Sequence, residues 1–100
     1  MTDILKRVFQ VIEGRIQHPQ EDSYTNHLLA KGEDEILKKI GEESVEVILA
    51  AKGQGDKRLI SEVADLTYHT LVLLAARGLT LEDIAGELEG RFGQHHLKER

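Results

Sequence analysis

The sequence predicts an all-α fold, a helical bundle centred on an antiparallel hairpin of two helices. Apolar residues recur at helical spacing through most of the 100-residue chain. The chain has a single proline, and no segment shows a convincing strand pattern. Two long periodic segments flank the turn sequence GQGD at residues 53–56, so we expect them to fold back on each other. A chain of this length forms one domain, residues 1–100.

The N-terminal third of the chain predicts two helices. The first covers Thr2–Gln17 and ends before His18-Pro19, because the residue before a proline avoids the helical region. Residues 18–24, HPQEDSY, form a polar connector. A short helix follows over about Thr25–Lys31, and Gly32 stops it.

The rest of the chain predicts the hairpin and one more helix. The hairpin helices cover about Glu33–Lys52 and Lys57–Arg77, with Asp56 as the expected cap of the second and Gly78 at its end. Thr80 and Asp83 resemble a capping box. They open a last helix with one apolar face, made of Leu81, Ile84, Leu88 and Phe92. We expect the tail QHHLKER to fray, and its His95-His96 pair to bind no metal.

Composition excludes several classes of protein. There is no cysteine, so disulfides and thiolate zinc sites are absent. The formal net charge of −5 argues against a nucleic-acid binder, which usually presents a basic face. The apolar segments are too short or too interrupted for a membrane span, and the N-terminus lacks a signal-peptide pattern. We therefore expect a soluble, cytoplasmic protein.

Acidic residues gather on the two hairpin helices. The second helix is apolar almost all round, which indicates burial, yet it carries one titratable stripe, Arg58, Glu62, Asp65 and His69. The first helix carries Glu42, Glu43 and Glu46 between two apolar edges. With the turn centred between Gln54 and Gly55, these two sets lie at the same height.

Such a cluster of carboxylates needs a cation, because like charges in a partly dry site repel strongly. Mg²⁺ is the simplest choice, since it prefers oxygen ligands and accepts substrate phosphates as well. Zinc fits less well, because only His69 lies nearby. The plain alternative is a solvated helix face, with Lys38 and Lys39 balancing the glutamates.

The pattern Glu42-Glu43-x-x-Glu46, followed after a spacer by Glu62-x-x-Asp65, resembles the signature of the all-α MazG-like nucleotide pyrophosphohydrolases. Within that superfamily the chain resembles the phosphoribosyl-ATP pyrophosphohydrolase family of histidine biosynthesis. Three segments carry the resemblance: DSYTNHLLAKG at 22–32, ILKKIGEESVEVILAAK at 36–52 and EVADLTYHTLVLL at 62–74.

The resemblance implies hydrolysis of phosphoribosyl-ATP to phosphoribosyl-AMP and pyrophosphate with Mg²⁺, in a cytoplasmic homodimer. It implies that Glu42, Glu43, Glu46, Glu62 and Asp65 form the metal-binding and catalytic set. Candidate substrate-binding residues are Ser23, Tyr24, Thr25, Lys39, Arg58 and His69. Capping of the short helix by residues 23–25, and a packing role for His69, remain alternatives.

Two other functions compete with this one. A house-cleaning pyrophosphohydrolase for nucleoside triphosphates would use the same carboxylates, and its specificity would lie around Ser23–Thr25 and Lys31. A non-enzymatic helical module could offer its acidic stripe to a basic partner. Only the enzymes require a divalent metal.

Overall fold

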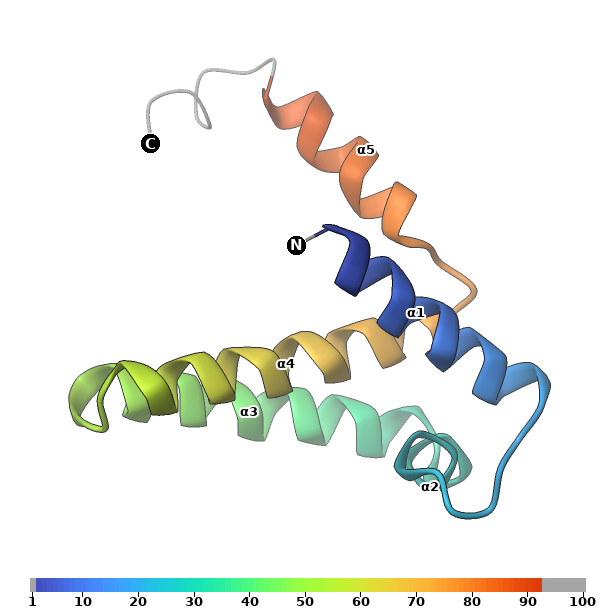
Figure 1. Ribbon diagram of the computed structural model, residues 1–100, viewed down its shortest axis with the longest axis horizontal. Helices are drawn as coiled ribbons and strands as arrows, with labels where there is room; N and C mark the ends of the chain where they lie inside the picture. The colour runs from blue at the N-terminus through green and yellow to red at the C-terminus, as the bar shows by residue number, and fades with distance from the viewer. Residues whose placement is uncertain (1, 93–100) are drawn as a thin grey trace.

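The computed structural model describes residues 2–92, which form five helices and no strand (Figure 1). The helices are α1 (Thr2–Gln17), α2 (Tyr24–Lys31), α3 (Glu33–Gly53), α4 (Asp56–Ala76) and α5 (Leu81–Phe92). α3 and α4 lie side by side as the antiparallel hairpin, α1 crosses α4, and α2 sits at the start of α3 (Figure 1). The predicted all-α architecture is confirmed. The tail, with His95-His96, lies outside the described residues.

Most helix ends follow the predicted local signals. α1 ends at Gln17, before His18-Pro19. α2 begins one residue earlier than expected, because the Ser23 side chain accepts a hydrogen bond from the backbone N–H of Asn26 at 3.3 Å. The capping box before α5 is present: Thr80 N–H donates to Asp83 Oδ2 at 2.8 Å, and Asp83 N–H donates to Thr80 Oγ1 at 3.2 Å.

The prediction that Asp56 caps α4 is wrong. Gly55 occupies the cap position with φ 88°, and no side chain caps the helix there. A positive φ favours glycine, which lets the chain reverse within the two residues Gln54 and Gly55. Asp56 therefore lies inside the first turn of α4, where its charge suits the positive end of the helix dipole.

The buried core lies at the end of the hairpin away from the turn. There α1 and α2 cover α3 and α4, and the buried apolar side chains of this cluster are Phe9, Ile12, Leu28, Ile36, Leu71 and Val72. The turn half of the hairpin has no such cover. Ile60 is 70% exposed and Ile48 60% exposed. α5 extends away from the hairpin without a buried residue (Figure 1).

α4 is long enough and apolar enough to cross a membrane by length and composition alone, which differs from the expectation of interrupted apolar segments. The core helix of a soluble protein passes the same test. α4 packs along α3 and against α1, and it carries Glu62 and His69 as buried polar residues. We therefore interpret it as the central helix of the bundle.

Candidate active site

Three carboxylates from the two hairpin helices converge between them. One oxygen each from Glu43 on α3 and from Glu62 and Asp65 on α4 lies within 4.8 Å of the other two. We call these three residues the acidic trio. Glu62 is only 5% exposed, Glu43 is partly buried, and Asp65 is exposed. The trio therefore runs from a buried carboxylate at Glu62 to a solvent-exposed one at Asp65.

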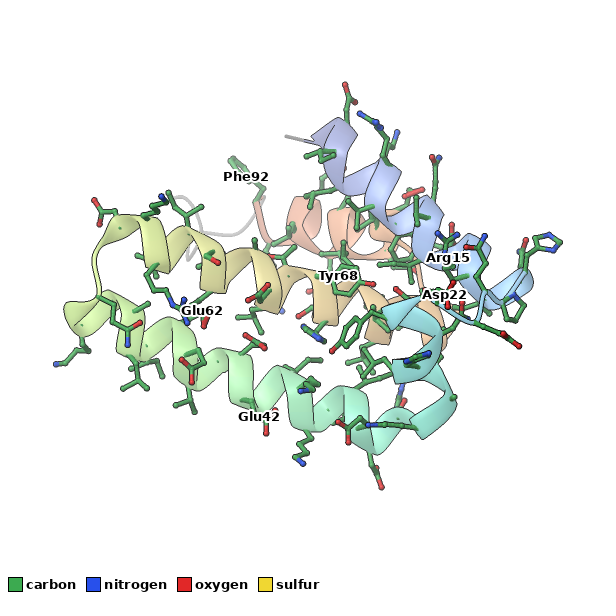
Figure 2. The ribbon with its side chains drawn as sticks, turned by 60° about the horizontal axis from the view of Figure 1, so that its bottom comes forward. Arg15, Asp22, Glu42, Glu62, Tyr68 and Phe92 are labelled. Atoms are coloured by element: carbon green, nitrogen blue, oxygen red, sulfur yellow. The ribbon has the colours of Figure 1, made fainter. Side chains whose placement is uncertain are left out.

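The other two predicted carboxylates lie outside the trio. Glu42 is exposed and points away from α4 (Figure 2). Its Oε1 lies 3.7 Å from Lys39 Nζ. Glu46, one turn after Glu43, is partly buried. The hairpin register predicts how far along α3 each glutamate lies. The direction of each side chain then decides that Glu43 joins the trio and Glu42 does not.

Two cations flank the acidic trio. Arg58 Nη2 lies 3.9 Å from Glu62 Oε1, one turn earlier on α4. Lys39 lies one turn before Glu43 on α3, and its positive charge acts to lower the pKa of the Glu43 carboxyl. Both cations keep part of their surface in solvent. Lysine and arginine side chains of this kind can form charge-assisted hydrogen bonds with phosphate oxygens.

The pKa of Glu43 is raised above the ordinary glutamate value. Partial burial is the largest cause, and the negative charges of Asp65 and Glu62 add to it. The positive charge of Lys39 acts in the opposite direction, as a proton on the His69 ring would. The acidic trio is thus a site in which ionised carboxylates repel one another, and this repulsion favours a proton or a cation between them.

The start of α2 lies against the same site through side-chain hydrogen bonds. The Tyr24 hydroxyl is 2.8 Å from His69 Nε2. Thr25 is 5% exposed, and its hydroxyl is hydrogen-bonded to the hydroxyl of Tyr68. Of the predicted substrate-binding residues here, Ser23 caps α2, Thr25 is buried, and Tyr24 remains 49% exposed.

Tyr68 is the residue that the sequence interpretation missed. It follows Asp65 by three positions on α4, and its ring centre lies 6.3 Å from that of Tyr24 and 5.5 Å from that of His69. It entered the sequence analysis only within the segment 62–74 that carries the family resemblance, with no role of its own. The partner of its hydroxyl, Thr25, is seen only once α2 is placed over α4.

The arrangement suits hydrolysis of a phosphoanhydride. Carboxylates alone make the trio a site for a hard cation with oxygen ligands, and Lys39 and Arg58 add positive charge for phosphate groups. Carboxylates that are not used as ligands can accept a proton from an attacking water. Fold and site together define an all-α, MazG-like pyrophosphohydrolase.

The chain belongs to the phosphoribosyl-ATP pyrophosphohydrolase family, whose sequence model matches residues 5–92. It is 49% identical over 94 residues to a phosphoribosyl-ATP pyrophosphatase of Bacillus mycoides, covering 94% of this chain and 88% of that one. It is 52% identical over 89 residues to one of Clostridium acetobutylicum, covering 89% and 81%. It also matches 44% of a longer bifunctional histidine biosynthesis protein, HisIE, of Caldanaerobacter subterraneus at 48% identity, over 90% of this chain. The chain is therefore an enzyme that hydrolyses a pyrophosphate bond.

Proposed function

We propose that this chain hydrolyses phosphoribosyl-ATP to phosphoribosyl-AMP and pyrophosphate in histidine biosynthesis, as a Mg²⁺-dependent enzyme of the cytoplasm. The observation that supports this function best is the acidic trio, built from two helices inside a chain that matches the family over residues 5–92. The non-enzymatic interaction module is not retained, because the relatives are enzymes.

The donor set fits Mg²⁺. Mg²⁺ prefers oxygen ligands and is usually held by carboxylates together with water and substrate phosphates. The trio offers one carboxylate oxygen from each of three residues, all within 4.8 Å of one another. We propose Glu43, Glu62 and Asp65 as ligands, while Glu42, which points away from α4, and Glu46 lie outside this set. When bound, the ion would neutralise negative charge on the phosphate oxygens.

The chain's own residues have distinct proposed roles. Lys39 and Arg58 bind phosphate oxygens on the two sides of the trio. Glu46, partly buried one turn after Glu43, is better placed than the exposed Glu42 to take a proton from water. Tyr24 and His69 border the nucleotide on the side of α2.

We also propose a homodimer. The half of the hairpin nearer the turn exposes five large apolar side chains, Val45, Ile48, Leu49, Ile60 and Val63. We call them the turn-end apolar patch. Small domains bury a smaller share of their surface than large ones, and oligomers often cover what a single chain leaves exposed. A second copy of the chain would cover this patch and leave the trio between well-packed helices.

The test is an assay of pyrophosphate release from phosphoribosyl-ATP, with Mg²⁺ and with chelator. A parallel panel of ordinary and non-standard nucleoside triphosphates separates this function from the house-cleaning alternative. Glu43→Gln protein, purified identically, controls for contaminating hydrolases. We expect release from phosphoribosyl-ATP only with wild-type protein and Mg²⁺. Release from the triphosphates alone would contradict the proposal.

A further inference from the structure

Four side chains join the start of α2 to the middle of α4. Tyr24 bonds to His69, and Thr25 bonds to Tyr68, so consecutive residues on one helix pair with consecutive residues on the other. We call these four residues the α2–α4 clasp. Both side-chain hydrogen bonds between α2 and α4 within residues 2–92 belong to it. Thr25 and His69 are buried, at 5% and 7% exposure.

The direction of the Tyr24–His69 hydrogen bond follows from a third group. His69 Nδ1 lies 2.8 Å from the backbone carbonyl oxygen of Asp65. A carbonyl oxygen can only accept, so Nδ1 carries a proton, and a ring with that single proton has a lone pair on Nε2. In this tautomer the Tyr24 hydroxyl donates its proton to Nε2. The Tyr24 oxygen can then only accept a hydrogen bond from a ligand, through its lone pairs.

The Tyr24 hydroxyl also lies near the charged groups of the site. Lys39 acts to lower its pKa and Glu43 to raise it, while partial burial is the main cause of a raised pKa. Behind it the rings of Tyr24, Tyr68 and His69 contact one another, with centres 5.5–6.3 Å apart. The His69 ring meets both tyrosine rings edge-to-face, at 86° and 88°, a geometry that aromatic pairs prefer. Tyr24 itself keeps half of its surface exposed.

We propose that Tyr68 and His69 are positioning residues, which hold the Tyr24 hydroxyl as a hydrogen-bond acceptor for a sugar hydroxyl or base amino group of the nucleotide. Ionised phosphate oxygens are acceptors only, so a hydroxyl whose proton is committed to His69 cannot bind them. Phosphates are left to the metal site, Lys39 and Arg58. The clasp thus recognises the nucleoside part. This proposal rests on the proposed function and assigns the roles of residues within it.

The first experiment is steady-state kinetics with phosphoribosyl-ATP at saturating Mg²⁺, well below the melting temperature. We expect Tyr24→Phe to raise KM about three- to tenfold and change kcat about twofold at most, the effect of one lost hydrogen bond made equally in ground and transition states. His69→Leu and Tyr68→Phe shift KM in the same direction, and His69→Gln, which keeps an acceptor, recovers part of it. Thr70→Val is the control, because Thr70 bonds only to the Leu66 carbonyl of its own helix.

A paired variant separates positioning from stability. Tyr68→Phe leaves the buried Thr25 hydroxyl without its partner, and Thr25→Val removes that hydroxyl too. We expect the double variant to recover much of the melting temperature that Tyr68→Phe loses, while KM stays raised. If KM recovers together with the melting temperature, the clasp is only structural and the proposal is wrong.

The acceptor role is tested with substrate analogues that lack single sugar hydroxyls or the base amino group. One analogue should lose about three- to tenfold in kcat/KM with the wild type and little with Tyr24→Phe. If no analogue behaves so, the acceptor assignment is overturned. If the wild type is active on phosphoribosyl-ATP and the Tyr24, Tyr68 and His69 variants have an unchanged KM, this proposal is overturned and the proposed function stands. A wild type inactive on phosphoribosyl-ATP overturns the proposed function as well.

Discussion

Glu43 is the residue at which the metal-site proposal makes its sharpest prediction. It is partly buried next to two other carboxylates, so its negative charge opposes folding while no cation is bound. Glu43→Gln should raise the metal-free melting temperature by roughly 1–4 °C, given a few tenths of a kcal/mol per like-charge pair. It should also abolish turnover and the Mg²⁺-induced rise in melting temperature. Thermal melts with and without Mg²⁺ measure both effects, and Glu89→Gln on exposed α5 is the control. An unchanged Mg²⁺ effect would remove Glu43 from the site.

The raised pKa of Glu43 gives this prediction a pH dependence. A carboxyl whose folded pKa lies above its unfolded pKa binds protons more readily in the folded state, so its contribution to stability falls as pH rises. The difference in melting temperature between Glu43→Gln and wild type should therefore grow as pH rises from the ordinary glutamate range, near the reference value of 4.5, towards neutrality. Metal-free melts across that range measure it. A difference independent of pH would show that charge repulsion is not the cause.

At the residue scale, the sequence predicts a position best where a helix sets it. Glu62 and Asp65 stand out because they interrupt an otherwise apolar helix, and the short turn sets the height of Glu43. Position along a helix follows from counting residues, but side-chain direction across a hairpin depends on how the two helices roll against each other. That roll leaves Glu42 exposed, and no local signal in the sequence encodes it.

At the scale of elements, one ion pair closes the open end of the hairpin. Arg77, after the last turn of α4, donates to both carboxylate oxygens of Glu33 at the start of α3, at 2.7 and 3.0 Å. Such a two-point contact has defined geometry. Since both side chains are partly exposed, at 60% and 39%, we expect only a small loss of melting temperature in Arg77→Gln. Because the two side chains act as a pair, the double variant Glu33→Gln with Arg77→Gln should lose little more than Arg77→Gln alone.

This pair has the opposite pH dependence to Glu43. The hydrogen bonds from Arg77 lower the pKa of Glu33, so its stabilisation is present above the unfolded pKa and lost as pH falls through the folded pKa. The melting temperatures of wild type and Arg77→Gln should therefore converge in acid. Melts from neutral pH downwards check this, and a constant difference would mean that Arg77 acts through packing instead.

The elements themselves were largely predictable, because proline, glycine and capping residues mark the helix ends locally. The contact between α2 and α4 was not. Thr25 and Tyr68 lie 43 positions apart, and the polar connector before α2 has no periodic pattern to fix its direction. The α2–α4 clasp is a tertiary feature. The sequence shows its residues singly and does not show which of them pair.

At the scale of the whole molecule, the single chain is more open than its length requires. Its radius of gyration is 15.2 Å, against about 13 Å for a compact domain of 100 residues. The core occupies one end of the hairpin, while the turn-end apolar patch and α5 extend from it. The sequence indicated this incompleteness, since α4 is apolar on nearly all sides and a single chain cannot cover it. Which sides stay uncovered depends on where α1 packs.

Ile60 tests whether a second copy covers the patch. It is 70% exposed in the single chain, so Ile60→Asp would cost a monomer little, as surface substitutions usually do. In a dimer it would bury an unpaired charge, which costs several kcal/mol. We therefore expect the variant to be monomeric, with a lower melting temperature, where the wild type is dimeric by light scattering at micromolar concentration. Gln54→Asp, in the exposed turn, adds the same charge change and should stay dimeric. A monomeric wild type, or a dimeric Ile60→Asp protein of full stability, would place the partner elsewhere or exclude one.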